Sequence, residues 1–142
     1  MKVLSLFDGI SCGMLALQRA GIPVECYDAF EIDKYAVTVS KRNFPVIVHH
    51  GNVYDGDFTQ FKGYDLLLGG SPCTYWSIAK KDREIDCDGE GFRLFQEYVR
   101  ALEESGCQYF LYENNYSVHQ NIKDELSDCQ PIAANGKVSW YI

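Results

Sequence analysis

Two residues that could do covalent chemistry follow two apolar segments of the chain. Cys73 ends the segment 69–73, directly after the apolar run 64–68. A thiol placed just beyond a buried strand, and positioned by a proline, is where a cysteine nucleophile would be held. Glu113 follows the apolar run 109–112, so the parallel sheet expected for these runs would bring its carboxyl group beside Cys73 as an acid partner. An inert thiol and a solvated carboxylate are the plainer interpretations.

A glycine-containing turn and a second carboxylate follow the first two expected strands. The turn covers residues 7–13, and its glycines, Gly9 and Gly13, would let a ligand approach the backbone. Their spacing differs from the dinucleotide-binding GxGxxG pattern. Glu31 ends the second strand, where an acid can accept both hydroxyl groups of a ribose. A tight strand-to-helix turn and a carboxylate solvated beside Lys34 are the alternatives.

The elements that must position these residues are short apolar runs alternating with helical stretches. This alternation predicts an α/β fold built on a mostly parallel sheet. The acidic stretch 74–90 is expected to form a long mobile loop. The expected strands cover residues 3–7, 24–30, 46–48, 64–68, 109–112 and 137–142, and the expected helices cover 14–20, 34–43, 92–104 and 122–126.

Composition predicts one soluble globular domain. The chain has 142 residues, of which 46% are hydrophobic and 23% are charged. A signal peptide and an apolar run long enough for a membrane span are both absent from the sequence, which favours the cytoplasm. The six cysteines contain no CxxC pair, so free thiols are favoured over disulfides or a metal site. The net charge of −7 is unsuited to gripping a polyanion, so any nucleic-acid role needs a local basic patch or another protein.

Taken together, these segments resemble the DNA cytosine-5 methyltransferases, most closely those of phages. The resemblance covers almost the whole chain, in the order of the family's motifs. It implies a Rossmann-like S-adenosylmethionine-dependent methyltransferase fold, truncated, with helices flanking the sheet. The matching segments are 4–9 with Gly13, 31–33, 51–53, 70–73, 91–95 and 112–115.

The resemblance also implies roles for individual residues. Cys73 would attack C6 of a flipped-out cytosine, while Glu113 holds N3 and the exocyclic amine, so that C5 takes the methyl group. S-adenosylmethionine would be the cofactor and S-adenosylhomocysteine the product, and no metal is implied. The substrate-binding residues would be Ser71, Pro72 and Asn114, and the cofactor-binding residues would be Phe7, Asp8, Gly9, Gly13, Glu31, Ile32, Asn52, Val53 and Pro72.

The chain departs from the family pattern at three places. Asn52 stands where the family usually has aspartate, which removes a charge beside the adenine. Asn115 replaces the usual valine. After Ser139 the family continues into an arginine-containing segment, a target-recognition domain and closing motifs. We therefore expect residues 1–142 to be a single catalytic core without these parts.

Several expectations follow from this interpretation. DNA would be bound through a partner chain that supplies target recognition, in the cytoplasm of a bacterial or phage-infected cell, and the target sequence cannot be read from this chain. An exposed sheet edge and an uncovered apolar face favour self-association. The alternatives are an inactive truncated homologue that binds S-adenosylmethionine or a protein partner, an RNA cytosine-5 methyltransferase, and a non-enzymatic domain of similar topology.

Overall fold

A five-stranded parallel sheet forms the centre of the computed structural model, which describes residues 1–75 and 89–114. The strand order is β3-β2-β1-β4-β5, and every neighbouring pair of strands is parallel. This arrangement confirms the predicted α/β class. The strands are β1 (Lys2–Leu6), β2 (Cys26–Phe30), β3 (Val48–His49), β4 (Leu66–Gly69) and β5 (Tyr109–Tyr112).

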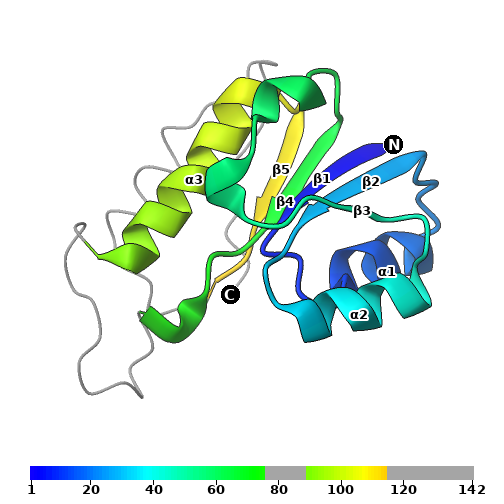
Figure 1. Ribbon diagram of the computed structural model, residues 1–142. Helices are drawn as coiled ribbons and strands as arrows, with labels where there is room; N and C mark the ends of the chain where they lie inside the picture. Colours follow the sequence, from blue (N-terminus) through cyan, green and yellow to red (C-terminus); the bar gives the residue numbers. More distant parts are fainter. Residues whose placement is uncertain (76–88, 115–142) are drawn as a thin grey trace.

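Helices cover both faces of this sheet (Figure 1). Two helices, α1 (Cys12–Arg19) and α2 (Lys34–Asn43), lie on one side, and the longer α3 (Glu90–Ser105) lies on the other. Three short 3-10 helices complete the described parts of the chain and were not predicted from the sequence. They are η1 (Val53–Asp55), η2 (Phe58–Phe61) and η3 (Cys73–Tyr75).

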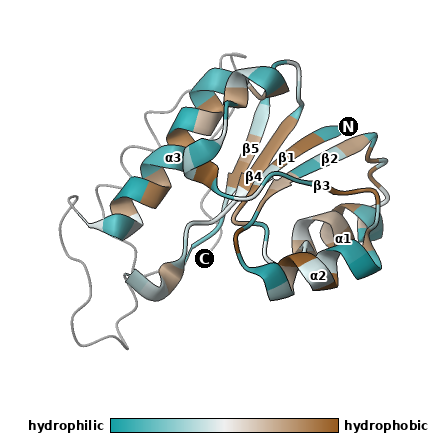
Figure 2. Ribbon diagram, viewed as in Figure 1, coloured by the Kyte–Doolittle hydropathy of each residue, from teal (hydrophilic) through white to brown (hydrophobic). Residues whose placement is uncertain are grey.

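Side chains of β1 alternate between two apolar cores. Leu4 faces the core that contains Phe95 of α3, whereas Val3 faces the core that contains Met14 of α1. Because successive side chains of a strand point to opposite faces, a strand covered on both sides must be apolar at nearly every position. Figure 2 shows this concentration of apolar residues in the central strands, with polar residues on the outer helix surfaces.

Local sequence signals mark the two ends of α2 and the end of α3. Helix α2 has the predicted bounds because the Asp33 carboxylate accepts hydrogen bonds from the backbone N–H groups of Tyr35 and Ala36, and Pro45 follows closely. Helix α3 extends beyond the predicted 92–104 at both ends and stops at Gly106, whose φ is 63°.

Strand bounds that depend on pairing also differ from the predictions, although the fifth strand, β5, has the predicted bounds. The predicted third strand is present, but its bounds differ from 46–48, since β3 covers only the two residues that pair with β2. The second strand begins at Cys26 rather than at Val24, level with the start of β1. The first helix begins at Cys12, two residues earlier than predicted.

Some predicted features lie outside the described residues. These are Asn115, the helix 122–126, the strand 137–142 and the greater part of the loop 74–90. Within the described ranges, Tyr109 and Leu111 of the terminal strand β5 are each more than half exposed, as an open apolar edge requires. No helix in those ranges is long and apolar enough to cross a membrane. Self-association remains a prediction.

Arg100 of α3 holds η1 against that helix. Its guanidinium group donates hydrogen bonds to the carbonyl oxygens of Gly56 (2.9 Å) and Val53 (3.1 Å). Glu97 and Glu104 hold the same guanidinium group in place by ion pairs. The backbone around Val53 is therefore fixed by a helix that lies more than 40 residues away in the sequence.

Phe95 tests how much α3 depends on the sheet core. The ring is fully buried, so Phe95→Ala is expected to lower the free energy of unfolding by about 3–5 kcal/mol through lost burial and the cavity left behind. Urea denaturation measures the loss. Tyr35→Ala is the control, since that ring is 73% exposed and its removal is expected to change stability by less than about 0.5 kcal/mol. Equal losses would contradict the described core.

Candidate functional site

The carboxyl ends of four strands stop side by side. The last residues of β1 and β2, Leu6 and Phe30, are in register, and so are those of β1 and β4, Leu6 and Gly69. Gly69 in turn pairs with Tyr112 at the end of β5. The next residue of each strand is therefore delivered to one edge of the sheet, where ligands bind in open α/β folds.

A pocket of about 220 Å³ opens at this edge. Its walls are largely apolar, with one carboxylate, and it contains six of the residues predicted to form the cofactor site. Those six are Phe7, Glu31, Ile32, Asn52, Val53 and Pro72. The sequence interpretation missed the other four lining residues, Phe30, Gly51, Gly70 and Leu94. Three of these four lie in segments matched to the family, and Phe30 directly precedes Glu31. Their nearness in the sequence to predicted site residues could therefore have identified them.

Glu31 is held in place by backbone donors. Its Oε2 accepts a hydrogen bond from the Gly9 N–H at 2.8 Å, and its Oε1 accepts one from the Asp33 N–H at 2.8 Å. Each carboxylate oxygen has a second lone pair, so both oxygens can still accept hydrogen bonds from a ligand. The carboxylate is therefore oriented by the protein itself, and each of its oxygens keeps room for one further hydrogen bond.

The turn after β1 contains three residues in the left-handed region. They are Phe7 (φ 56°), Gly9 (φ 58°) and Ser11 (φ 66°). Left-handed backbone is uncommon for residues other than glycine and gathers at functional sites, where the surrounding structure must hold it. Here the turn carries Phe7 into the pocket wall and points the Gly9 N–H at Glu31.

Two residues predicted to bind the cofactor act from inside the fold. The Asp8 carboxylate accepts hydrogen bonds from Ser5 and Tyr27, each at 2.7 Å, and from Ser11. A Cβ on Gly13 would lie 2.8 Å from both the Leu68 Cδ1 and the Tyr27 hydroxyl, so this glycine allows α1 to pack on the sheet. Neither residue lines the pocket, and direct contact of either with a cofactor stays a prediction.

Asn52 lies in the pocket wall at the start of η1. Its side-chain oxygen accepts a hydrogen bond from the Tyr54 N–H at 3.2 Å, as an aspartate could at the same position. Val53 beside it is 4% exposed. This part of the pocket wall is therefore held in place, and Asn52 gives it an uncharged polar side chain.

The loops that carry Cys73 and Glu113 are in direct contact. The Glu113 N–H donates a hydrogen bond to the Gly69 carbonyl oxygen at 2.8 Å. A Cβ on Gly70 would lie 2.1 Å from the Glu113 carbonyl oxygen and 3.2 Å from its Oε2. Cys73 follows as the first residue of η3, and it is exposed. Only glycine at position 70 permits this close approach of the two loops.

Side chains of Ser71, Tyr112 and Asn114 join the same two loops. The Asn114 Nδ2 donates hydrogen bonds to the Ser71 carbonyl oxygen (2.9 Å) and to the Tyr112 hydroxyl (3.2 Å). The Ser71 and Tyr112 hydroxyl oxygens lie 2.5 Å apart, and burial raises the pKa of Tyr112. These bonds tie Ser71 and Asn114 to the protein's own structure, and contact of either with a substrate stays a prediction.

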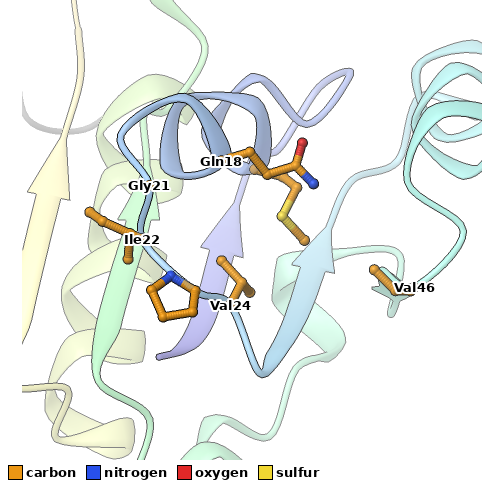
Figure 3. A pocket seen from close by; sticks show the side chains of 7 residues that line it. Gln18, Gly21, Ile22, Val24 and Val46 are labelled. Atoms are coloured by element: carbon orange, nitrogen blue, oxygen red, sulfur yellow. The ribbon is translucent and has the colours of Figure 1, made fainter.

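A second pocket, of about 350 Å³, lies at the amino ends of β2 and β3 (Figure 3). None of its lining residues carries a titratable side chain, so it offers no acid, base or nucleophile. The lining residues are Met14, Gln18, Gly21, Ile22, Pro23, Val24 and Val46.

The chain is similar to known cytosine methyltransferases. Residues 1–128 match the family described as C-5 cytosine-specific DNA methylase. The orphan methyltransferase M.SPRI of Bacillus phage SPR is 36% identical over 116 residues, which cover 80% of this chain and 26% of that protein. The type II methyltransferase M.HgiCII of Herpetosiphon aurantiacus is 34% identical over 80% of this chain and 25% of its own length. The chain thus spans about a quarter of these relatives.

Solved structures share the fold. A variant of Spodoptera frugiperda DNMT2 matches with a TM-score of 0.68 and 25% identity over 90% of this chain and 41% of that one. The S. pombe Dnmt2 methyltransferase matches with a TM-score of 0.67 and 20% identity over 89% of this chain and 40% of that one. These matches confirm the Rossmann-like methyltransferase fold predicted from the sequence.

Gly70→Ala tests the contact between the two loops. The new methyl group would collide with the Glu113 backbone, so the free energy of unfolding is expected to fall by about 3 kcal/mol, the upper range for overpacked sites. Gly9→Ala is the matched control, because its Cβ would meet nothing within 4 Å and only its positive φ costs stability, about 1 kcal/mol. Urea denaturation measures both, and a Gly70→Ala loss no larger than the control's would contradict the contact.

Proposed function

Because the chain belongs to the C-5 cytosine-specific DNA methylase family, we propose that it carries the catalytic core of a DNA (cytosine-5-)-methyltransferase. The observation that carries the proposal is the shared register of four strand ends, which supports a cofactor pocket beside a thiol and a carboxylate. The proposal concerns the core alone, since the relatives are about four times as long as the segment matched.

We propose S-adenosylmethionine as the cofactor of this pocket, with S-adenosylhomocysteine as the product, and three features of the pocket support it. Glu31 keeps two lone pairs for the ribose hydroxyls. Ile32, which is 76% exposed, offers an apolar wall for a purine, and nothing lies within 4 Å of a Cβ at Gly9, so a ligand can approach that backbone. Asn52 and Val53 would flank the adenine with Pro72, and Asp8 and Gly13 would act by shaping the turn.

The chemistry we propose begins with the Cys73 thiolate, which bonds to C6 of cytosine. Glu113 holds N3 and the exocyclic amine and lends a proton as the ring gains electron density. S-adenosylmethionine supplies an electrophilic methyl group, which C5 accepts. Loss of the C5 proton to a base then restores the C5–C6 double bond, and the electron pair of the S–C6 bond returns to Cys73.

A cytosine inside a duplex hides its C6 atom, so the base must be flipped out before the thiolate can reach it. The net charge of −7 gives this core little basic surface for phosphates. We propose that further polypeptide, on a second chain or covalently attached, supplies target recognition and the grip on DNA. Phage and bacterial relatives support action in the cytoplasm of a bacterial or phage-infected cell.

Trapping the covalent adduct tests this function. DNA that contains 5-fluorocytosine is incubated with the protein and labelled S-adenosylmethionine, with and without a polypeptide that carries the relatives' remaining region. A labelled covalent adduct is expected in the presence of that polypeptide, because fluorine at C5 blocks the loss that would release the enzyme. The adduct is measured by denaturing gel electrophoresis.

Cys73→Ala is expected to abolish this adduct, and Cys26→Ala is the matched control that should retain it. RNA that contains 5-fluorocytosine serves as a parallel substrate. An adduct with RNA alone would replace the DNA proposal by the RNA alternative. Cofactor binding without any adduct would leave the inactive homologue as the function.

Glu31→Gln tests the cofactor pocket. An amide at this position loses the charge and would turn an N–H group toward a backbone N–H or a ribose hydroxyl, so the Kd for S-adenosylhomocysteine is expected to rise about 10-fold or more. Isothermal titration calorimetry measures the change. Glu25→Gln, an exposed substitution before β2, is the control and should leave the Kd unaltered. Unchanged affinity in Glu31→Gln would contradict the ribose contact.

A further inference from the structure

A chain of buried and partly buried side-chain hydrogen bonds leads away from the turn after β1. The Ser11 hydroxyl donates to Asp8, and its oxygen lies 2.5 Å from the Ser40 hydroxyl oxygen on α2. The Ser40 oxygen in turn lies 3.1 Å from the Nε2 of His49 on β3. Ser11 and Ser40 are both fully buried, so water does not replace a broken link. None of the functional steps above uses Ser40 or His49.

Counting protons fixes the direction of this chain. A serine hydroxyl has one hydrogen, and that of Ser11 goes to the Asp8 carboxylate, so Ser40 must donate to Ser11. The hydrogen of Ser40 is thereby used, and the His49 Nε2 must donate to Ser40. The hydrogen bonds then run in one direction, from His49 through both serines to Asp8, and such aligned bonds strengthen one another.

The surroundings of His49 agree with this direction. Nε2 carries the hydrogen, so Nδ1 is the bare nitrogen, and in the described residues it is buried without a hydrogen-bond partner. A second proton would place an N–H group there with no acceptor. Burial lowers the pKa of His49, and Lys41 and His50 lower it further, while the carboxylates of Asp8 and Glu31 raise it. The ring is therefore neutral at pH 7.

The chain ends on the residues that hold the left-handed turn. Ser11 has a φ of 66° and is anchored by Asp8 on one side and Ser40 on the other. The Asp8 carboxylate also accepts hydrogen bonds from the Ser5 and Tyr27 hydroxyls. The residues before and after Gly9 are therefore both held in place. The Gly9 N–H can then point at Glu31 without rearrangement.

We infer that Ser40 and His49 are positioning residues for the cofactor pocket, acting through Ser11 and Asp8 on the Gly9–Glu31 contact. Neither touches the cofactor, and the inference rests on the proposed function in taking the pocket's ligand to be S-adenosylmethionine. This chain of hydrogen bonds links α2 and β3 to the turn after β1, so the pocket's shape depends on residues outside its lining.

The tautomer of His49 tests the chain without any ligand. Long-range ¹H–¹⁵N correlation spectra of the histidine rings are expected to show hydrogen on Nε2 and a bare Nδ1 at pH 7. In Ser40→Ala the Gly9 amide resonance is expected to shift, because the turn loses its anchor. Hydrogen on Nδ1, or an unmoved Gly9 resonance in Ser40→Ala, would overturn the inference.

Ligand affinity tests the positioning role. Ser40→Ala and His49→Phe are each expected to raise the Kd for S-adenosylhomocysteine about 10-fold, the effect of one lost buried hydrogen bond. His49→Gln keeps an N–H donor at the place of Nε2 and is expected to stay within about 3-fold of the wild type. Thr38→Ala, which removes an exposed hydroxyl of the same helix α2, is the matched control.

The pattern among the variants separates positioning from general destabilisation. A merely structural role would weaken His49→Gln and His49→Phe alike, and that result would overturn the inference, as would wild-type affinity in Ser40→Ala. If the wild type itself does not bind S-adenosylhomocysteine, the proposed function fails, and the ring tautomer together with the Gly9 resonance still decides the inference.

Discussion

The parallel pairing of β1 with both of its neighbours is the constraint on which the site depends. Since Leu6 is level with Phe30 on one side and with Gly69 on the other, the chain leaves three strands at one height. β5 joins them through the pairing of Gly69 with Tyr112. Four loops then share one edge of the sheet, and each contributes a different group. No loop has to be long for these groups to meet.

The two halves of the site are fastened in different ways. Around the pocket, backbone N–H groups orient the Glu31 carboxylate, and buried hydroxyls hold the turn that supplies one of those N–H groups. Around Cys73, close steric contact at Gly70 and the bonds of Asn114 hold two loops together. The first arrangement leaves carboxylate oxygens free to accept hydrogen bonds from a ligand. The second fixes the distance between the two loops.

Sequence patterns predicted those parts that depend on neighbouring residues. The bounds of α2 followed from the Asp33 cap and a nearby proline, and the residues after each strand followed from the apolar runs. The 3-10 helices η1 and η2 were missed because residues of the distant helix α3 hold them. Arg100 donates to the Val53 carbonyl oxygen in η1, and the Glu104 carboxylate accepts a hydrogen bond from the Phe58 N–H in η2. The inward direction of Asp8 was also missed, although two of its donors, Ser5 and Ser11, each lie three residues away, and only Tyr27 comes from another strand.

The glycine at position 70 has a consequence for how such a protein can diversify. The close approach of the Gly70 and Glu113 backbones is imposed by main-chain contacts within this core. Under the proposed function, recognition regions could be exchanged in evolution while the loops that carry Cys73 and Glu113 keep this contact. The catalytic core and the target-recognition region could then evolve independently, and they would need to fit together only where the flipped base enters the site.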